Sequence, residues 1–319
     1  MIRVLGVDGG QSGIRLRHSG SAHVIEVEGV SRLEGDTVAV VAEAVANGWR
    51  QGSFEPVERA VLGLSTAPSD EAEAERLCAA VALATGAADV WLADDAVTSH
   101  AGALSLGWGV SLVAGTGVAC LALPERGSAR ILGGHGYLLG DEGGGFWIGR
   151  RALGDVLRAG EGRGADVDEA VLSAAAQRRF GNLDGLATRL HSADRPVHAI
   201  ASFARDVQDA AGDGDPTAIA ILGEAVAELL ALARAGVRCA GDAGQDSGAP
   251  VPLALGGRLL AEGTPLRRLL DAGLAQSGLT VAPRSADASG LDGAIRLGLA
   301  GDDHPYDGLV HRWRQGVPA

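Results

Sequence analysis

The sequence of 319 residues contains no lysine, so all 27 of its lysine-or-arginine positions are arginines. Three catalytic devices depend on lysine: the Walker A phosphate loop, the β3 lysine of protein kinases, and Schiff bases with carbonyls or pyridoxal phosphate. The absence of lysine excludes all three. If this chain handles phosphate, it must use backbone amides, metal and arginine.

Cysteine is also scarce. Cys78, Cys120 and Cys239 are far apart in the sequence and form no CxxC pair. Neither a disulfide framework nor a zinc or iron-sulfur ligand set is predicted from such spacing. A reducing cytoplasm fits this cysteine content.

Positive charge is in the minority, with a net charge of −13. This balance opposes an extended basic surface for nucleic acid or for an anionic membrane. The first residues lack the pattern of a signal peptide, and the longest apolar stretch, 218–234, contains Glu224 and Glu228, which oppose a membrane span. We therefore expect a cytoplasmic protein with small-molecule partners, and neither nucleic acid nor membrane as a partner.

Glycine, in contrast, is abundant at 49 residues, and 46% of the chain is hydrophobic. Since domains of about 100–200 residues are typical, the length predicts two lobes with buried cores. Apolar strands alternate with helical spacing, which indicates an α/β fold. Strands are predicted at 2–7, 13–17, 22–27, 60–64 and 90–92, with helices at 36–49, from Ser69 or Asp70, and from Asp94.

The pattern restarts at Trp108. Strands are predicted at 109–114, 118–123, 130–134, 252–255 and 279–282, with helices between 146 and 240 and at 290–299. Both halves open with an apolar strand, a glycine-rich turn and a returning strand. This weak repeat predicts two related lobes that face each other, 1–107 and 108–300, the second with a helical insertion. A tail at 301–319 gives little structural signal.

Two strand ends combine glycine with a hydroxyl residue. In Asp8-Gly9-Gly10-Gln11-Ser12 the glycines would let the backbone approach a phosphate, the carboxylate could hold hydrated Mg²⁺, and Ser12 could donate to a phosphate oxygen. Gly115-Thr116-Gly117 offers a similar cradle in the second half. The alternative reading of each motif is an ordinary hairpin turn.

Three further motifs could line a site. One carboxylate of Asp94-Asp95, at a strand end, could accept a proton, although both could simply cap the following helix. The stretch 133–145 has glycines interleaved with apolar residues, which indicates an ordered binding loop, and its Asp141 and Glu142 could accept hydrogen bonds from sugar hydroxyls. Gly256-Gly257 would let a flat purine lie against the backbone, or would serve helix–strand packing.

In this order and spacing the motifs resemble the sugar-kinase, Hsc70 and actin superfamily, and within it the BadF/BadG/BcrA/BcrD ATPase family, which includes N-acetylglucosamine kinase. The most specific part runs from Asp95 to Trp147. The resemblance implies two ribonuclease-H-like, actin-like ATPase lobes with ATP and Mg²⁺ in the cleft between them. It also implies a homodimer that transfers the γ-phosphoryl group to the 6-hydroxyl of an amino sugar of the N-acetylglucosamine or glucosamine type.

The resemblance assigns roles to residues of this sequence. It makes Asp95 the general base that orients and deprotonates the sugar hydroxyl, and Asp8 the residue that holds magnesium through water. The sugar would contact Asp95, Gly134, His135, Gly136 and Asp141. ATP and its phosphates would contact Gly9, Gly10, Ser12, Gly115, Thr116, Gly117, Gly256 and Gly257.

The sequence departs from the family's pattern in the sugar pocket. Hexosamine kinases of this kind generally have tryptophan at the position of His135 and asparagine at those of Ala119 and Arg32. Arg32 and His135 could both pair with a carboxylate, so a lactyl-bearing sugar such as N-acetylmuramic acid is an alternative substrate. The other reading is that Arg32 simply points into solvent.

Two alternatives belong to other functional classes. Some family members are ATPase activators of acyl-CoA reductases or dehydratases, with a [4Fe-4S] cluster on cysteines between two subunits. Cys78, Cys120 and Cys239 do not resemble that ligand set, because Cys120 lies in a predicted strand and the other two in helices. A sugar-sensing regulator on a kinase scaffold is the third reading, and only an assay separates an inactive kinase from an active one.

Overall fold

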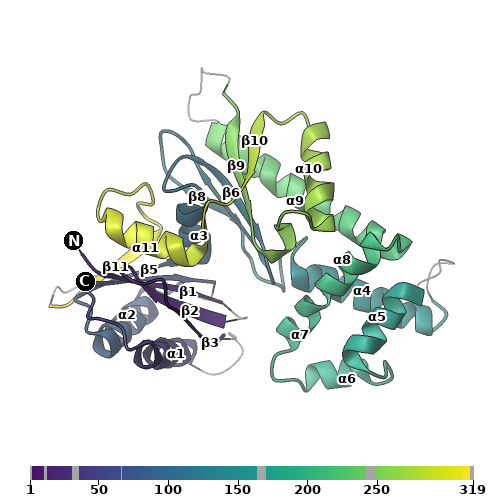
Figure 1. Ribbon diagram of the computed structural model, residues 1–319, viewed down its shortest axis with the longest axis horizontal. Helices are drawn as coiled ribbons and strands as arrows, with labels where there is room; N and C mark the ends of the chain where they lie inside the picture. Colours follow the sequence, from purple (N-terminus) through teal and green to yellow (C-terminus); the bar gives the residue numbers. More distant parts are fainter. Residues whose placement is uncertain are drawn as a thin grey trace.

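The computed structural model describes residues 2–10, 13–30, 36–65, 67–163, 170–241 and 249–316. Within these ranges the chain forms two lobes, each built on one β-sheet (Figure 1). The predicted α/β class is confirmed. Ser12 and Arg32 lie outside the described residues.

The first lobe contains a six-stranded sheet of order β11-β5-β4-β1-β2-β3. β1, β4 and β5 are parallel, whereas β2, β3 and β11 pair antiparallel with their neighbours. The strands are β1 (Val4–Gly9), β2 (Gly13–His18), β3 (Val24–Glu28), β4 (Arg59–Leu64), β5 (Asp89–Asp94) and β11 (Val310–Arg314).

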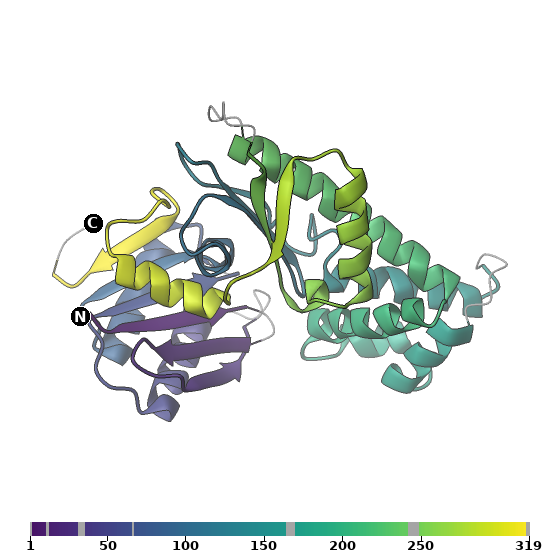
Figure 2. The same cartoon turned by 45° about the horizontal axis from the view of Figure 1, so that its top comes forward.

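Helices cover both faces of this sheet, α1 and α2 on one side and α3 and α11 on the other (Figures 1 and 2). The four helices are α1 (Thr37–Gly52), α2 (Glu71–Thr85), α3 (Asp95–Ala103) and α11 (Gly290–Ala300). α1 illustrates why they form where they do: Asp36 accepts a hydrogen bond from the N–H of Val38, at 3.1 Å, and caps the helix. Val38, Val41 and Val45 then bury one helical stripe in the core.

The second lobe contains a five-stranded sheet of order β10-β9-β6-β7-β8. β10, β9 and β6 are parallel, and β7 and β8 return antiparallel. The strands are β6 (Gly109–Ala114), β7 (Val118–Leu123), β8 (Arg130–Gly133), β9 (Val251–Gly256) and β10 (Val281–Ser285).

The long helix α9 lies along this sheet (Figure 2). The helices of this lobe are α4 (Gly145–Gly160), α5 (Ala170–Phe180), α6 (Leu186–His191), α7 (Pro196–Ser202), α8 (Ala204–Gly212), α9 (Pro216–Gly241), the 3₁₀ turn η1 (Arg258–Leu260) and α10 (Pro265–Gln276). Helices α4, α8 and α10 pack on α9, and α5, α6 and α7 extend this helical layer through contacts with α4, α8 and one another. α9 is long and apolar enough to cross a membrane by length and composition alone, so Glu224 and Glu228 do not exclude it on that test. In this fold Ile221, Leu222 and Leu229 bury one face of α9 in the second core.

The C-terminal part of the chain returns to the first lobe, which differs from the boundaries expected at 108–300 and 301–319. α11 packs on α3 and on β1 and β4, and β11 pairs with β5 along the edge of the first sheet. Arg312 lies over the ring of Trp91, with its guanidinium carbon 4.6 Å from the ring centroid. No local pattern signals this return, because the strand that pairs with β11 lies more than 200 residues earlier in the chain.

Candidate active site

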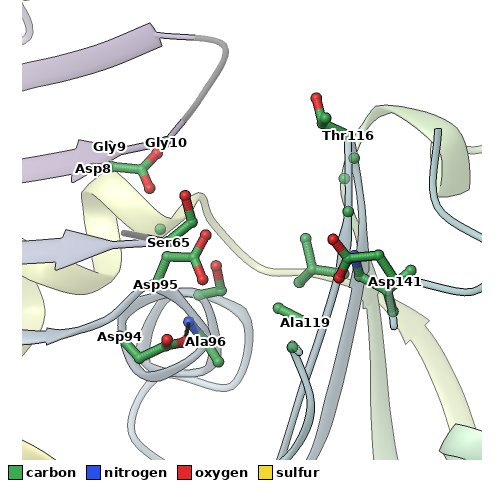
Figure 3. Close-up of a pocket in the computed structure, with 18 of the residues that line it drawn as sticks. Asp8, Gly9, Gly10, Ser65, Asp94, Asp95, Ala96, Thr116, Ala119 and Asp141 are labelled. Carbon is green, nitrogen blue, oxygen red and sulfur yellow. Dashed lines mark hydrogen bonds between the residues drawn. The ribbon is translucent and has the colours of Figure 1, made fainter. Parts of the chain in front are cut away.

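A cleft of about 680 Å³ opens between the two lobes. Asp95 and Asp141 face it from opposite sides (Figure 3). Most of the residues that the sequence singled out line this cleft: Asp8, Gly9, Gly10, Asp95, Gly115, Thr116, Gly117, Gly134, Gly136, Asp141 and Gly257. Gly256 and His135 do not line it, and His135 is exposed to solvent.

Asp95 is the first residue of α3 and extends into the cleft, whereas Asp94 caps the helix (Figure 3). The carboxylate of Asp94 accepts a hydrogen bond from the N–H of Ala96 at 2.9 Å. Burial, followed by the charges of Asp94 and Asp8, raises the pKa of Asp95 well above its ordinary value. Of the two carboxylates, Asp94 therefore caps the helix and Asp95 lies buried in the cleft.

Asp8 lies inside β1 rather than after it, because the strand continues to Gly9. Its register partner on β2 is Arg15, and the two side chains form an ion pair. Burial raises the pKa of Asp8 in spite of the opposing charge of Arg15. Asp8 is the next-to-last residue of β1. A single carboxylate at such a position could hold a hydrated magnesium ion through water.

The two glycine turns differ from simple amide cradles. The N–H of Gly10 donates to the carbonyl oxygen of Gly13 at 3.1 Å, and that of Gly115 donates to the carbonyl oxygen of Gly117 at 2.9 Å. Gly10 and Gly115 thus shape their turns with their own amides. A ligand that approaches either turn must find its donors at other residues.

Asp141 is placed by the second turn. Its carboxylate accepts a hydrogen bond from the N–H of Val118 at 3.2 Å, and it occupies the space that a Cβ on Gly117 would need. Burial is the main cause that raises the pKa of Asp141. The glycine at 117 is therefore explained by the carboxylate beside it.

Gly257 has a φ of +86°, and a Cβ there would overlap the carbonyl oxygen of Ala114. Only glycine combines this backbone conformation with so close an approach. The contact joins the end of β9 to the end of β6, one residue before the second glycine turn. Arg258 follows and lines the cleft.

The glycine-rich loop contributes backbone and one aromatic ring to the cleft. Gly134 and Gly136 have φ values of +69° and +75°. Tyr137 lines the cleft and contacts the ring of Phe146, with centroids 5.0 Å apart. Ala119 also lines the cleft. The aromatic residue at the cleft wall is therefore Tyr137, two residues after His135, the position at which related hexosamine kinases generally have tryptophan.

Sequence reasoning missed seven polar or aromatic lining residues: Arg15, Glu26, Ser65, Ser99, Tyr137, Arg258 and Ser289. Four of them lie near a motif in the sequence. Arg15 and Glu26 follow the first glycine motif in strands of alternating pattern. Tyr137 lies inside the glycine-rich loop, and Arg258 directly follows Gly257. Ser65 follows the end of β4, which carries no motif.

The three cysteines do not gather at one place, although Cys239 lies near enough to Cys120 to add to the effect of burial, which raises the pKa of the Cys120 thiol. Cys78 is buried in the core of the first lobe, Cys120 is buried in that of the second, and Cys239 packs against the second core. Across the described residues, no group of three or more His, Cys, Asp or Glu side chains is arranged to hold a metal ion.

Two lobes of this topology, with a cleft between strand ends, define the actin-like ATPase fold that sugar kinases share. The family model for the BadF/BadG/BcrA/BcrD ATPases matches residues 5–265, and the chain belongs to this family. The family and the fold expected from the sequence are confirmed.

Relatives in sequence and structure agree with this assignment. An N-acetylmuramic acid/N-acetylglucosamine kinase from Clostridium acetobutylicum is 25% identical over 242 residues, which cover 73% of this chain and 78% of the relative. A proposed N-acetylglucosamine kinase from Chromobacterium violaceum has a TM-score of 0.68 and 28% identity, with 92% of this chain and 98% of that one covered. A ROK family glucokinase from Streptomyces griseus, in complex with glucose and AMPPNP, has a TM-score of 0.58 and 17% identity, with coverage of 92% and 97%. The expected class of enzyme, a sugar kinase, is thereby confirmed.

Proposed function

We propose that the protein transfers the γ-phosphoryl group of ATP to the 6-hydroxyl of an amino sugar of the N-acetylglucosamine or glucosamine type, with Asp95 as general base. The observation that carries the proposal is the position of Asp95, a carboxylate of raised pKa at a helix start in the cleft between two glycine turns. The amino sugar is suggested by the relatives from Clostridium and Chromobacterium.

In the proposed reaction the magnesium complex of ATP is the donor. The turns at Gly9-Gly10 and Gly115–Gly117 would hold its phosphates, and Asp8 would hold the magnesium ion through water, where the ion would neutralise phosphate charge. Asp95 takes the proton of the sugar hydroxyl as the oxygen forms its bond to the γ-phosphorus. The bond from the γ-phosphorus to the bridging oxygen of ADP breaks, and the products are the sugar 6-phosphate and ADP.

The sugar itself is proposed to lie at Gly134, Gly136 and Asp141, against the ring of Tyr137. A carboxylate accepts hydrogen bonds from sugar hydroxyls, and an aromatic face packs against the C–H groups of a sugar ring. Asp141 is well suited to the first task because the N–H of Val118 fixes one of its oxygens at 3.2 Å.

Replacement of Asp95 tests the proposal. We expect Asp95→Asn to lower kcat by about 10²–10⁴, the contribution typical of a general base. The measurement is coupled ADP release over a panel of glucosamine, N-acetylglucosamine, N-acetylmuramic acid, N-acetylmannosamine and glucose. Asp70→Asn is the matched control, because Asp70 also stands at a helix start, as the N-cap of α2, and does not line the cleft.

The pH profile adds a second readout. Asp95 must be ionised to accept a proton, and its pKa is raised, so kcat/KM of the wild type should fall as the pH falls through that raised value. Full turnover by Asp95→Asn, or turnover of none of the five sugars by the wild type, would contradict the proposed function.

A further inference from the structure

Arg258 lines the second-lobe wall of the cleft, as does Val197, the residue before His198. Arg258 is exposed there, and no hydrogen bond or ion pair joins it to another described residue. Burial, followed by the charges of Arg195 and Arg258, lowers the pKa of His198, so both arginines lie near this histidine. We call Arg195, His198 and Arg258 the basic corner.

The basic corner lies next to the second glycine turn. Arg258 follows Gly257, whose backbone is packed on the carbonyl oxygen of Ala114 without room for a Cβ. Ala114 is in turn the residue before Gly115. The contact brings the start of η1 against the strand end from which the turn begins, so Arg258 and the turn share one part of the wall.

The acidic groups of the cleft lie mainly on the first-lobe wall, where Asp8, Asp94, Asp95 and Glu26 line it and Asp8 pairs with Arg15. The second-lobe wall carries one carboxylate, Asp141, and Arg258. In the basic corner, Arg195 has a carboxylate 3.8 Å away, that of Glu28 across the lobes. Arg258 has none among the described residues, in a chain whose net charge is −13. An arginine in a cleft without a counter-ion is suited to bind an anionic ligand.

We propose that Arg258 binds the phosphate groups of the nucleotide, with the basic corner as an anion subsite beside the Gly115–Gly117 turn. The inference rests on the proposed function in that it takes the donor to be a nucleoside triphosphate. The planar guanidinium offers a fork of N–H donors to phosphate oxygens. It supplies the positive charge that a lysine supplies in other phosphate loops and that this chain cannot take from lysine.

The test measures nucleotide binding in the absence of sugar. Isothermal titration calorimetry gives the Kd of magnesium AMPPNP and of adenosine for wild type, Arg258→Ala, Arg258→Lys and Arg234→Ala. Arg234 is the matched control, because it is an exposed arginine of the same lobe that does not line the cleft. Thermal unfolding checks that each variant is folded, which is expected because Arg258 is exposed.

We expect Arg258→Ala to weaken AMPPNP binding by about tenfold to a hundredfold, as loss of a charge-assisted hydrogen bond does, and to leave adenosine binding unchanged. Arg258→Lys should lose less, and Arg234→Ala nothing. Unchanged AMPPNP binding by Arg258→Ala, an equal loss for adenosine, or a wild type that binds no nucleotide would overturn the inference. A wild type that binds AMPPNP through Arg258 but phosphorylates no sugar would instead overturn the proposed function alone.

Discussion

The two sheets of this protein have the same strand order but different chemistry at their strand ends. The first runs β5-β4-β1-β2-β3 and the second β10-β9-β6-β7-β8, each with three parallel strands followed by two antiparallel ones. The edge strand β11 is the one addition to the first sheet. The weak internal repeat in the sequence is thus a repeat of topology.

Equivalent positions carry different residues. The fifth residue of β1 is Asp8, whereas the fifth residue of β6 is Val113. The helix after β5 begins with Asp95, and the helix after β10 begins with Gly290, where a Cβ would come within 3.0 Å of a carboxylate oxygen of Asp8. In each pair the first position carries an aspartate and the equivalent second one carries a small or apolar residue, of which Gly290 leaves room for Asp8.

Removal of the charge of Asp8 should have the largest effect, because this charge distinguishes the end of β1 from the end of β6. In Asp8→Asn the first strand end becomes uncharged, like that of β6, and its contact with magnesium through water is weakened. We expect the magnesium concentration for half-maximal activity to rise, or activity to fall, by about 10–100-fold. Magnesium titration of ADP release measures this change.

Glu58→Gln is the control for Asp8→Asn, because Glu58 also pairs with an arginine, Arg3, on the first lobe, but does not line the cleft. Unchanged magnesium dependence in Asp8→Asn would show that the two strand ends are equivalent for the metal.

Helices α3 and α11, which follow β5 and β10, pack closely at glycines of both helices. A Cβ on Gly293 of α11 would overlap the carbonyl oxygen of Thr98 on α3. Overpacking of this kind costs about 1–3 kcal/mol, so Gly293→Ala should lower the free energy of unfolding by that amount. Urea denaturation measures it.

Gly223→Ala gives the opposite sign. Gly223 lies within α9, and no atom within 4 Å would meet its Cβ. Alanine there should stabilise the protein by about 0.4–1 kcal/mol, because it lowers the entropy of the unfolded chain. Equal effects of the two substitutions would mean that the α3–α11 crossing is not close-packed.

Asp95 should show a smaller effect on stability. Because the pKa of Asp95 is raised in the folded state, Asp95 loses its proton at a lower pH in the unfolded chain than in the folded one. The folded state is then destabilised progressively between the ordinary aspartate pKa and the raised one, and the full cost remains above it. Asp95→Asn removes that cost, so its melting temperature should exceed that of the wild type at pH 8.

The advantage of Asp95→Asn should shrink as the pH falls toward 5, and thermal unfolding without ligands at several pH values measures it. A wild type that melts above the variant at pH 8 would contradict the pKa argument. Together with lower turnover, the expected stabilisation is the pattern of a residue kept for function at a cost in stability.

Much of the fold could be predicted because its signals are local. The strands at 109–114 and 118–123 are found as predicted, since apolar runs bounded by glycine define them. Asp36 and Asp70 mark helix starts because their side chains accept hydrogen bonds from the N–H groups of Val38 and Glu73. β11 escaped prediction because its stability depends on β5, a partner distant in sequence.

The site was predictable in part for the same reason. Glycine turns and strand-end carboxylates can be read from consecutive residues. The pairing of Arg15 with Asp8, the exposure of His135 and the entry of Tyr137 into the cleft all depend on register and loop path. These are decided only when the lobes are assembled.

The order and kind of the residues set the chemistry available to this protein: no lysine, abundant glycine, and carboxylates at the ends of apolar strands. Composition fixes which donors and charges exist, whatever the fold. Which of these groups come into contact depends on the assembled fold. Packing of Gly257 on Ala114 sets Arg258 beside a glycine turn. The parallel pairing of β1 and β5 with β4 brings Asp8 and Asp95 to the same end of the first sheet, because close approach between distant segments depends on how the strands assemble.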